Sequence, residues 1–174
     1  MRHMSEFNIR KLTRLDWQTY KSVRLASLDD SPESFGSTYD REVEFLQSEW
    51  ESRLDPTGSA KNALPLVVEI GAIPVGIAWG LVQERDPRIT HIYQLWVSPV
   101  ARNKGIAKAL IQRISAWGIE RGCEYIALSV TTANIAAVHL YQSLGFVPFG
   151  SLEELRVGST LMTQKMIKDL RNAA

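Results

Sequence analysis

Apolar positions recur along this chain with two different periods, and their order predicts a mixed α+β fold. Alternating or continuous apolar runs predict strands at residues 7–11, 66–70, 75–84, 89–97, 125–130, 146–149 and 160–167. Helical spacing, together with residues that start and stop helices, predicts helices at residues 13–28, 39–54, 105–121 and 133–144. This order places one strand–helix–strand unit at the centre of the fold, a connection that joins parallel strands.

The longest apolar stretch, residues 64–82, is nearly long enough to cross a bilayer as a helix. Gly71 and Pro74 interrupt it in a pattern typical of a turn between two strands. We therefore expect a buried hairpin and no membrane association. The chain has 174 residues, which suits a single domain over residues 1–174. We expect residues 1–4 to be disordered or foreign to the natural protein.

The charge balance argues against a nucleic-acid binder. Lys plus Arg number 20 and Asp plus Glu number 19, whereas nucleic-acid binding favours a basic excess. Cys123 is the single cysteine, so no intrachain disulfide can form and we expect a reducing, cytoplasmic setting. Cys123 lies in a helix-to-strand turn without the neighbours that activate a nucleophile. The three histidines are scattered without metal-ligand spacing, so we expect no metal site.

A loop rich in basic residues joins the strand ending at Val97 to the next helix. A helix N-terminus has unpaired N–H groups and the positive end of the helix dipole, which together favour phosphate. Gly105 lets the backbone approach an anion, and the side chains that add positive charge are Arg102, Lys104 and Lys108. The two best-known glycine-rich phosphate motifs, G-x-x-x-x-G-K-[ST] and G-x-G-x-x-G, do not occur in the chain. The loop is a candidate phosphate site; an ordinary helix start with solvated basic side chains is the alternative.

The helix predicted at residues 133–144 groups an amide, a small side chain and a phenol on one face. Asn134, then Ala137 or Val138, then Tyr141 follow one another at intervals of three to four residues. The small residue lets a ligand come close, and the polar pair can hold and protonate it. For Tyr141 alone, a tyrosine at the edge of the core, bonded to backbone, is the alternative.

These two motifs, in this order, resemble those of the GNAT superfamily of N-acetyltransferases. Residues 102–107 (Arg-x-x-Gly-x-Ala) resemble the family's Q/R-x-x-G-x-G/A pyrophosphate loop. Residues 134–146 match every defined position of its N-x-x-A-x-x-L-Y-x-x-x-G-F signature, and the resemblance spans about residues 7–168. It implies a mixed, mostly antiparallel twisted sheet of about seven strands flanked by about four helices, with a V-shaped splay between the fourth and fifth strands.

The resemblance implies direct transfer of an acetyl group from acetyl-CoA to a primary amine in a ternary complex. The positions that would bind acetyl-CoA are Leu95, Trp96, Val97, Arg102, Asn103, Lys104, Gly105, Ile106, Ala107, Lys108, Asn134, Ala137 and Tyr141. The Leu95 N–H would polarise the thioester carbonyl, and Tyr141 would protonate the departing thiolate as general acid. Dimers are common in this family, which leaves a homodimer open.

The general base is less well defined. Some family members have a carboxylate four residues before the position of Leu95, where this chain has His91. A histidine titrates near neutral pH, which suits the role. His91 shares a strand face with Leu95 only if no β-bulge intervenes, and this family often has one there. Glu84, Tyr93 and an ordered water are alternatives, and His91 would then be a surface or strand-end residue.

The resemblance places the acceptor against the first two helices and the loop between them, about residues 24–39. Two sets of side chains there could serve it, the aromatic Phe35, Tyr39 and Trp50 and the acidic Asp29, Asp30 and Glu33. Core packing and solvated carboxylates are the alternative. Three functions stay open: acetylation of a small-molecule amine, which a compact chain favours, acetylation of protein N-termini or lysines, and acyl-CoA sensing without catalysis.

Overall fold

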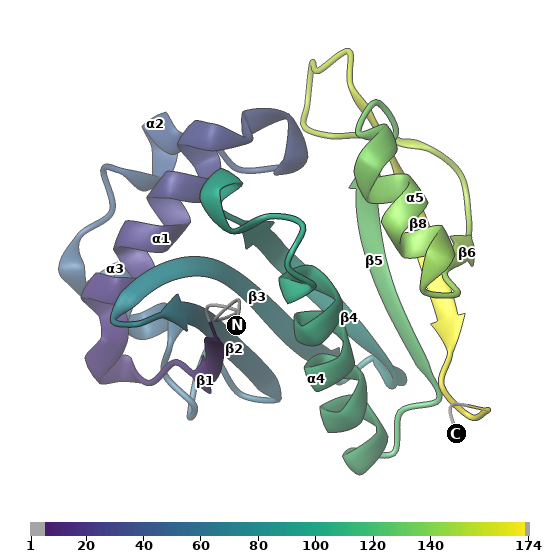
Figure 1. Ribbon diagram of the computed structural model, residues 1–174, viewed down its shortest axis with the longest axis horizontal. Helices are drawn as coiled ribbons and strands as arrows, with labels where there is room; N and C mark the ends of the chain where they lie inside the picture. Colours follow the sequence, from purple (N-terminus) through teal and green to yellow (C-terminus); the bar gives the residue numbers. More distant parts are fainter. Residues whose placement is uncertain (1–5, 173–174) are drawn as a thin grey trace, which may run out of the picture.

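A computed structural model describes residues 6–172 as one mixed sheet with helices on both faces (Figure 1). The strands are β1 (Phe7–Lys11), β2 (Ala63–Ile70), β3 (Ile73–Gln83), β4 (Asp86–Val97), β5 (Tyr125–Thr131), β6 (Val147–Pro148), β7 (Glu153–Glu154) and β8 (Met162–Asp169). The helices are α1 (Trp17–Asp30), α2 (Tyr39–Glu42), α3 (Gln47–Arg53), α4 (Ile106–Glu120) and α5 (Ile135–Ser143). Short 3-10 turns are η1 (Arg14–Asp16), η2 (Pro32–Ser34) and η3 (Pro99–Ala101). Our expectation for residues 1–4 lies outside the described residues.

The sheet confirms the predicted α+β class. Its strand order is β1-β2-β3-β4-β5-β8-β6, with β7 pairing to β8. β4 and β5 pair in parallel, and every other pair is antiparallel. The helix α4 connects the two parallel strands, so the central strand–helix–strand unit is also confirmed. The apolar stretch that we expected to be a hairpin forms β2 and β3, which pair antiparallel around Gly71.

The two faces of the sheet pack against different helices. Leu66, Val68 and Ala78 belong to a buried cluster that includes the apolar face of α4. Their strand neighbours Val67 and Ile77 belong to a second cluster formed with α1 and α3. Successive strand residues point to opposite faces, so continuously apolar strands such as β2 and β3 are buried on both sides.

The single helix expected at residues 39–54 is wrong, because the chain forms two short helices there. Leu46 adopts extended backbone (φ −71°, ψ 160°) between α2 and α3. The half-buried Phe45 packs against Trp50, with ring centroids 5.6 Å apart. The break at Leu46 directly follows this inward-facing ring. The break raises the number of α-helices in the described part of the chain to five, against about four expected.

The splay between β4 and β5 positions the candidate site. The two strands pair only where both begin, at residues 89–91 and 125–127. Figure 1 shows them diverging toward their carboxyl ends, with the start of α4 and the helix α5 on either side of the gap. The carboxyl ends of parallel strands are where ligands commonly bind in open sheets of this kind.

A β-bulge interrupts β4 within this splay. Trp79 pairs with Tyr93 and Ile77 pairs with Trp96, so two residues of β4 lie opposite Ala78 of β3. The first of these two is Gln94, whose φ of +55° lies in the left-handed region. A bulge breaks the ladder of hydrogen bonds locally and reverses which face the following side chains point to.

Candidate active site

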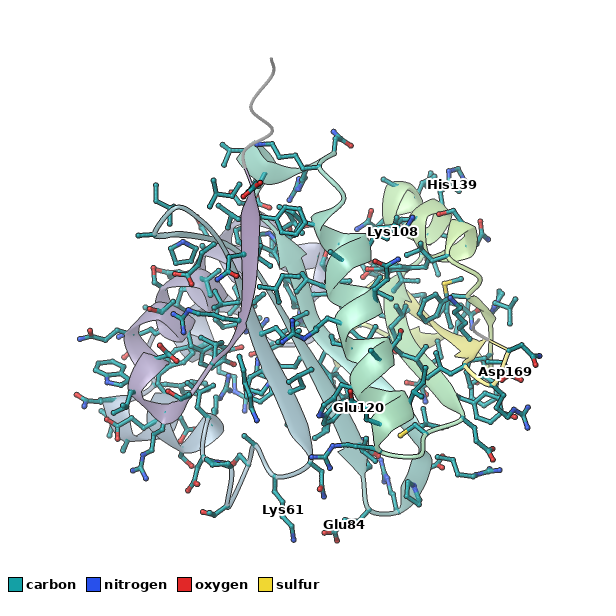
Figure 2. All side chains as sticks on the ribbon, turned by 60° about the horizontal axis from the view of Figure 1, so that its bottom comes forward. Lys61, Glu84, Lys108, Glu120, His139 and Asp169 are labelled. Atoms are coloured by element: carbon teal, nitrogen blue, oxygen red, sulfur yellow. The ribbon has the colours of Figure 1, made fainter. Side chains whose placement is uncertain are left out.

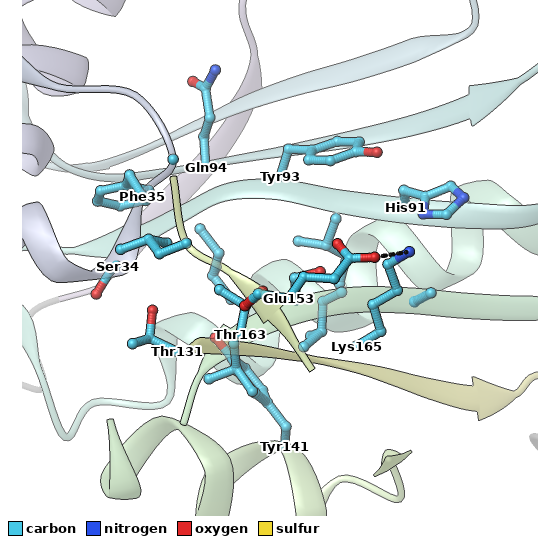
Figure 3. Close-up of a pocket in the computed structure, with 18 of the residues that line it drawn as sticks. Ser34, Phe35, His91, Tyr93, Gln94, Thr131, Tyr141, Glu153, Thr163 and Lys165 are labelled. Atoms are coloured by element: carbon cyan, nitrogen blue, oxygen red, sulfur yellow. Dashed lines mark hydrogen bonds and ion pairs between the residues drawn. The ribbon is translucent and has the colours of Figure 1, made fainter. Parts of the chain in front are cut away.

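A cleft of about 920 Å³ lies in the gap between β4 and β5. Figure 3 shows its two walls: His91, Tyr93 and Gln94 come from β4, and Tyr141 comes from α5 on the opposite side. Leu95 also lines the cleft. A cleft of this size accommodates a ligand larger than most metabolites.

Tyr141 lines the cleft and carries a phenol that can donate a proton. Burial raises the pKa of Tyr141 to about 12. Its ring makes an edge contact with Phe146, with centroids 6.1 Å apart, and this contact fixes the ring on the inner side of α5. The raised pKa keeps the phenol protonated near neutral pH, which is the form that donates a proton.

Asn134 and Ala137 form the start of the helix that carries Tyr141. The Asn134 side-chain oxygen accepts a hydrogen bond from the Ala137 N–H at 3.2 Å, so Asn134 is the N-cap of α5. Both residues line the cleft. Gly145 (φ +95°) follows the last turn in the left-handed conformation that commonly ends helices. The signature residues therefore build and orient the helix as well as border the cleft.

The basic loop forms the start of α4, beside the open end of the splay. Gly105 is the N-cap residue with φ +79°, and no atom lies within 4 Å of the place where a Cβ would be. Asn103 is also left-handed, with φ +63°. Lys104 and Lys108 are exposed, and Figure 2 shows Lys108 on the outer side of the first turn of α4. The loop thus presents open backbone, a helix N-terminus and positive charge, a combination that fits a phosphate group.

Arg102 has a structural contact that the sequence did not reveal. Its Nη2 donates to Asp30 Oδ2 at 2.8 Å and its Nε donates to the Val97 carbonyl at 3.0 Å. The same Asp30 oxygen accepts from Trp96 Nε1 at 3.0 Å and from Ser31 Oγ at 2.8 Å. Burial raises the pKa of Asp30, but these three donors outweigh it and lower the pKa overall. The network ties the end of α1 to the end of β4 and to the loop.

The family is decided by comparison with known proteins. The model of the acetyltransferase (GNAT) family matches residues 20–146. The chain belongs to this family.

Individual relatives agree with this assignment. Mycothiol acetyltransferase from Thermobispora bispora is 30% identical over 135 residues, which cover 75% of this chain and 43% of that protein. The chain spans less than half the length of the curated relatives that it matches. A GNAT-family acetyltransferase from Streptococcus pneumoniae has a TM-score of 0.76 at 23% identity, covering 94% of this chain and 99% of that one. A putative acetyltransferase from Salmonella typhimurium, solved with its cofactor acetyl-CoA, has a TM-score of 0.72 at 17% identity, covering 98% and 97%.

In this GNAT chain the bulge separates the side chains of His91 and Leu95. Before the bulge Ile92 packs toward α4, whereas after it Leu95 does. The His91 side chain therefore lies on the face opposite the Leu95 side chain, although both line the cleft. Burial lowers the pKa of His91; Asp86 opposes this effect and Lys165 adds to it. The neutral imidazole, which can accept a proton, is favoured.

The alternative bases lie in different surroundings. Tyr93 lines the cleft and stacks on His91, with ring centroids 6.0 Å apart. Glu84 is exposed beside Lys61 at the far end of the sheet (Figure 2), with 3.6 Å between the Glu84 and Lys61 charged groups. Glu84 does not line the cleft, although its neighbours Gln83 and Arg85 do.

The loop after α1 closes one end of the cleft through contacts that sequence reasoning missed. The Thr131 hydroxyl, at the end of β5, donates to the Glu33 carbonyl at 2.7 Å. Arg156 Nη2 donates to the carbonyls of Pro32 and Phe35, each at 2.8 Å. Phe35 lines the cleft. These bonds link segments about a hundred residues apart in the sequence, which no local pattern encodes.

Two of the other residues expected on the acceptor side have structural contacts of their own. Trp50 is fully buried in the cluster formed with α1 and α3, and Asp30 is already bound to Arg102 and Trp96.

Cys123 is buried and its thiol contacts the Pro87 carbonyl. Within residues 6–172, no group of three or more His, Cys, Asp or Glu side chains is placed to hold a metal ion. No helix in that range has the length and apolarity needed to cross a membrane.

Proposed function

We propose that this chain is an acetyl-CoA-dependent N-acetyltransferase that acetylates the primary amine of a small molecule. One observation carries the proposal: an open helix N-terminus at Gly105 and a half-buried, protonated Tyr141 flank the same strand splay. Membership in the GNAT family supports the reaction class. The cleft volume of about 920 Å³ is near the upper end of the range for ligand sites, which supports a small acceptor beside the acetyl end of the cofactor.

The loop would hold the diphosphate of acetyl-CoA, which supplies the acetyl thioester. Backbone N–H groups at residues 103–108 would donate to the phosphate oxygens, and Lys104 and Lys108 would add attraction that salt screens. Arg102 would contribute chiefly by fixing the loop, because its guanidinium is already bound to Asp30 and Val97. Leu95, Trp96 and Val97 would border the pantetheine arm along β4, and Asn134 and Ala137 would border it from α5.

Three groups of this chain would perform the transfer. The Leu95 N–H would donate to the carbonyl oxygen as negative charge develops there, an effect worth on the order of 3 kcal/mol. His91 would take a proton from the amine, directly or through water. Tyr141 would give its proton to the departing sulfur. The burial that raises the pKa of Tyr141 would also raise the pKa of a thiol leaving beside it, so the difference between the two pKa values would change little and the thiolate would still accept the proton.

The test combines thiol release from acetyl-CoA over a panel of amines with thermal shift by coenzyme A. We expect turnover with one or more free amines, and Tyr141→Phe to lower kcat at least tenfold with little change in coenzyme A affinity. Tyr125→Phe is the matched control, because its hydroxyl bonds Arg171 at the other end of β5.

Each other outcome rejects a defined part of the proposal. Unchanged turnover in Tyr141→Phe would remove Tyr141 from the mechanism. Turnover with peptides but with no free amine would assign the chain to protein acetylation. Stabilisation by coenzyme A without any turnover would favour a sensor, and the absence of any coenzyme A binding would reject the function altogether.

A further inference from the structure

A second cavity of about 330 Å³ adjoins the cleft on the side of α1 and α2. Arg24, Tyr93 and Gln94 line both cavities, so they form the boundary between them. Gln94 is the bulge residue immediately before Leu95, and its side-chain oxygen accepts a hydrogen bond from the Tyr20 hydroxyl at 2.9 Å. A group bound in this cavity would therefore lie beside the part of β4 where the acetyl carbonyl is proposed to sit.

The charges in the second cavity are unbalanced. Its lining contains three guanidinium groups, from Arg24, Arg41 and Arg53, and one carboxylate, from Glu42. Glu42 accepts from Arg24 through both oxygens, at 3.1 and 2.9 Å, and from Arg53 at 2.8 Å. Burial raises the pKa of Glu42, but these partners lower it overall, so the group is a carboxylate. Glu42 can compensate one of the three positive charges and leaves two in excess.

Three buried donors in the lining have no hydrogen-bond partner among the described residues: Arg24 Nη1, Trp79 Nε1 and Ser37 Oγ. Arg24 is 4% exposed, and its Nη1 makes no hydrogen bond although Nε and Nη2 are occupied by Glu42. The guanidinium is planar, so Nη1 points away from the edge that binds Glu42. The indole Nε1 of Trp79 is the second unpartnered donor. Leaving a buried donor unpaired costs free energy, and an acceptor-rich ligand would recover it.

We propose that this second cavity binds a carboxylate of the acceptor, so that the substrates are amines that also carry a carboxylate, as free amino acids do. The inference rests on the proposed function and names its substrate class. A carboxylate is acceptor-only and planar, and it matches the donors that Arg24, Arg41 and Trp79 present. Its binding would place the amine of the same molecule toward Gln94 and Leu95, at the boundary with the cleft. Of the three acidic residues expected to attract a cationic amine, Asp30 is already bound to Arg102.

Arg41 is the side chain best suited to a test. It is exposed at the rim of the cavity and makes no ion pair within residues 6–172, so its removal leaves the buried pair of Arg24 and Glu42 intact. Arg113 is the matched control, because it is an exposed arginine on α4 that lines neither cavity.

The experiment compares L-amino acids with their decarboxylated amines, such as phenylalanine with phenethylamine and lysine with cadaverine. Thiol release from acetyl-CoA gives kcat and KM, and calorimetric titration into the protein with coenzyme A present gives binding without turnover. We expect at least one amino acid to be preferred tenfold or more over its amine. Arg41→Ala should raise KM for that amino acid about tenfold and leave KM for the amine unchanged, which removes most of the preference. Arg113→Ala should keep the preference for the amino acid.

The outcomes separate this inference from the proposed function. The carboxylate site would be overturned if the amines were acetylated as well as their amino acids, or if Arg41→Ala kept the preference for the amino acid. Either result would leave the proposed acetyltransferase function standing. Coenzyme A binding without binding or turnover of any amino acid would also overturn it. Failure to bind coenzyme A would reject the proposed function itself, and amino-acid binding by calorimetry would then still support the cavity as a carboxylate site.

Discussion

Replacing Asp30 by alanine tests whether the end of α1 fixes the phosphate loop. In the structure one carboxylate oxygen accepts from Arg102, Trp96 and Ser31. These donors come from three places: the loop, the end of β4 and the residue that follows α1. Removing the carboxylate therefore releases three segments at once, and the cost can be estimated from the surroundings of each donor.

The Trp96 contact dominates the estimate. Trp96 is 7% exposed, so its indole N–H loses an acceptor with little access to water, which costs about 1–3 kcal/mol. The pair with Arg102 is half exposed, with side-chain exposures of 47% for Arg102 and 30% for Asp30, and contributes at most about 1 kcal/mol. The total is roughly 1–4 kcal/mol, and each kcal/mol lowers Tm by about 2–4 °C in a protein of this size.

Urea unfolding and thermal melts of the purified variants provide the assay. Asp30→Asn keeps an oxygen for Trp96 but loses the charge, so we expect about 1 kcal/mol for it. Asp29→Ala is the control, because Asp29 is its exposed neighbour. The folded pKa of Asp30 is lowered, so its stabilisation is present above the unfolded pKa of about 4 and is lost as the pH falls toward the folded value. The difference between wild type and Asp30→Ala should be constant from about pH 5 to 8 and should shrink below about pH 4.

Two results would refute this reasoning. An Asp30→Ala variant as stable as Asp29→Ala would show that the network carries no net stability. A stability difference that persists unchanged at about pH 3 would show that the ionised carboxylate is not its source.

Two further predictions concern His91 and Glu42. If His91 is the base, the acidic limb of kcat/KM should lie below pH 6.5, because burial lowers the pKa of this histidine, and the limb should disappear in His91→Gln; a pH profile indifferent to the change would remove His91 from the mechanism. Glu42→Ala should cost about 3–5 kcal/mol in urea unfolding, because it leaves the guanidinium of Arg24 buried without its counter-charge; the exposed Glu44→Ala should cost almost nothing, and equal losses in both would contradict the ion-pair argument.

The sequence predicts the fold well wherever structure is encoded locally. The turn at Gly71, the helix start at Gly105 and the left-handed Gly145 all depend on the backbone freedom of glycine, which can be read directly from the sequence. The hairpin and the central strand–helix–strand unit follow from apolar periodicity over short windows. The expected helix over residues 39–54 fails because its break depends on Phe45 packing against a core that no local pattern describes.

The site is predicted less completely, because many of its residues are positioned by hydrogen bonds between residues far apart in the sequence. The bond between Arg102 and Asp30 joins residues 72 positions apart, and the bonds from Arg156 to the loop after α1 span more than 120. The sequence singles out the basic loop as a candidate phosphate site and counts Arg102 among its free positive charges, whereas in the structure Arg102 is bound to Asp30 and Val97. It does not single out Arg24 and Arg41, since only the packed structure places them around one cavity.

The bulge in β4 shows how one residue can decide the chemistry of a site. Without it, His91 and Leu95 would share a face, because side chains alternate and the two residues are four apart. The extra residue at Gln94 turns the Leu95 side chain toward α4 and leaves His91 on the other face. The proposed role of Leu95 survives this reversal, because it depends on the backbone N–H, which lies in the plane of the sheet. The base and the oxyanion donor therefore need not share a face, and the acceptor can approach from the side of α1 and α2.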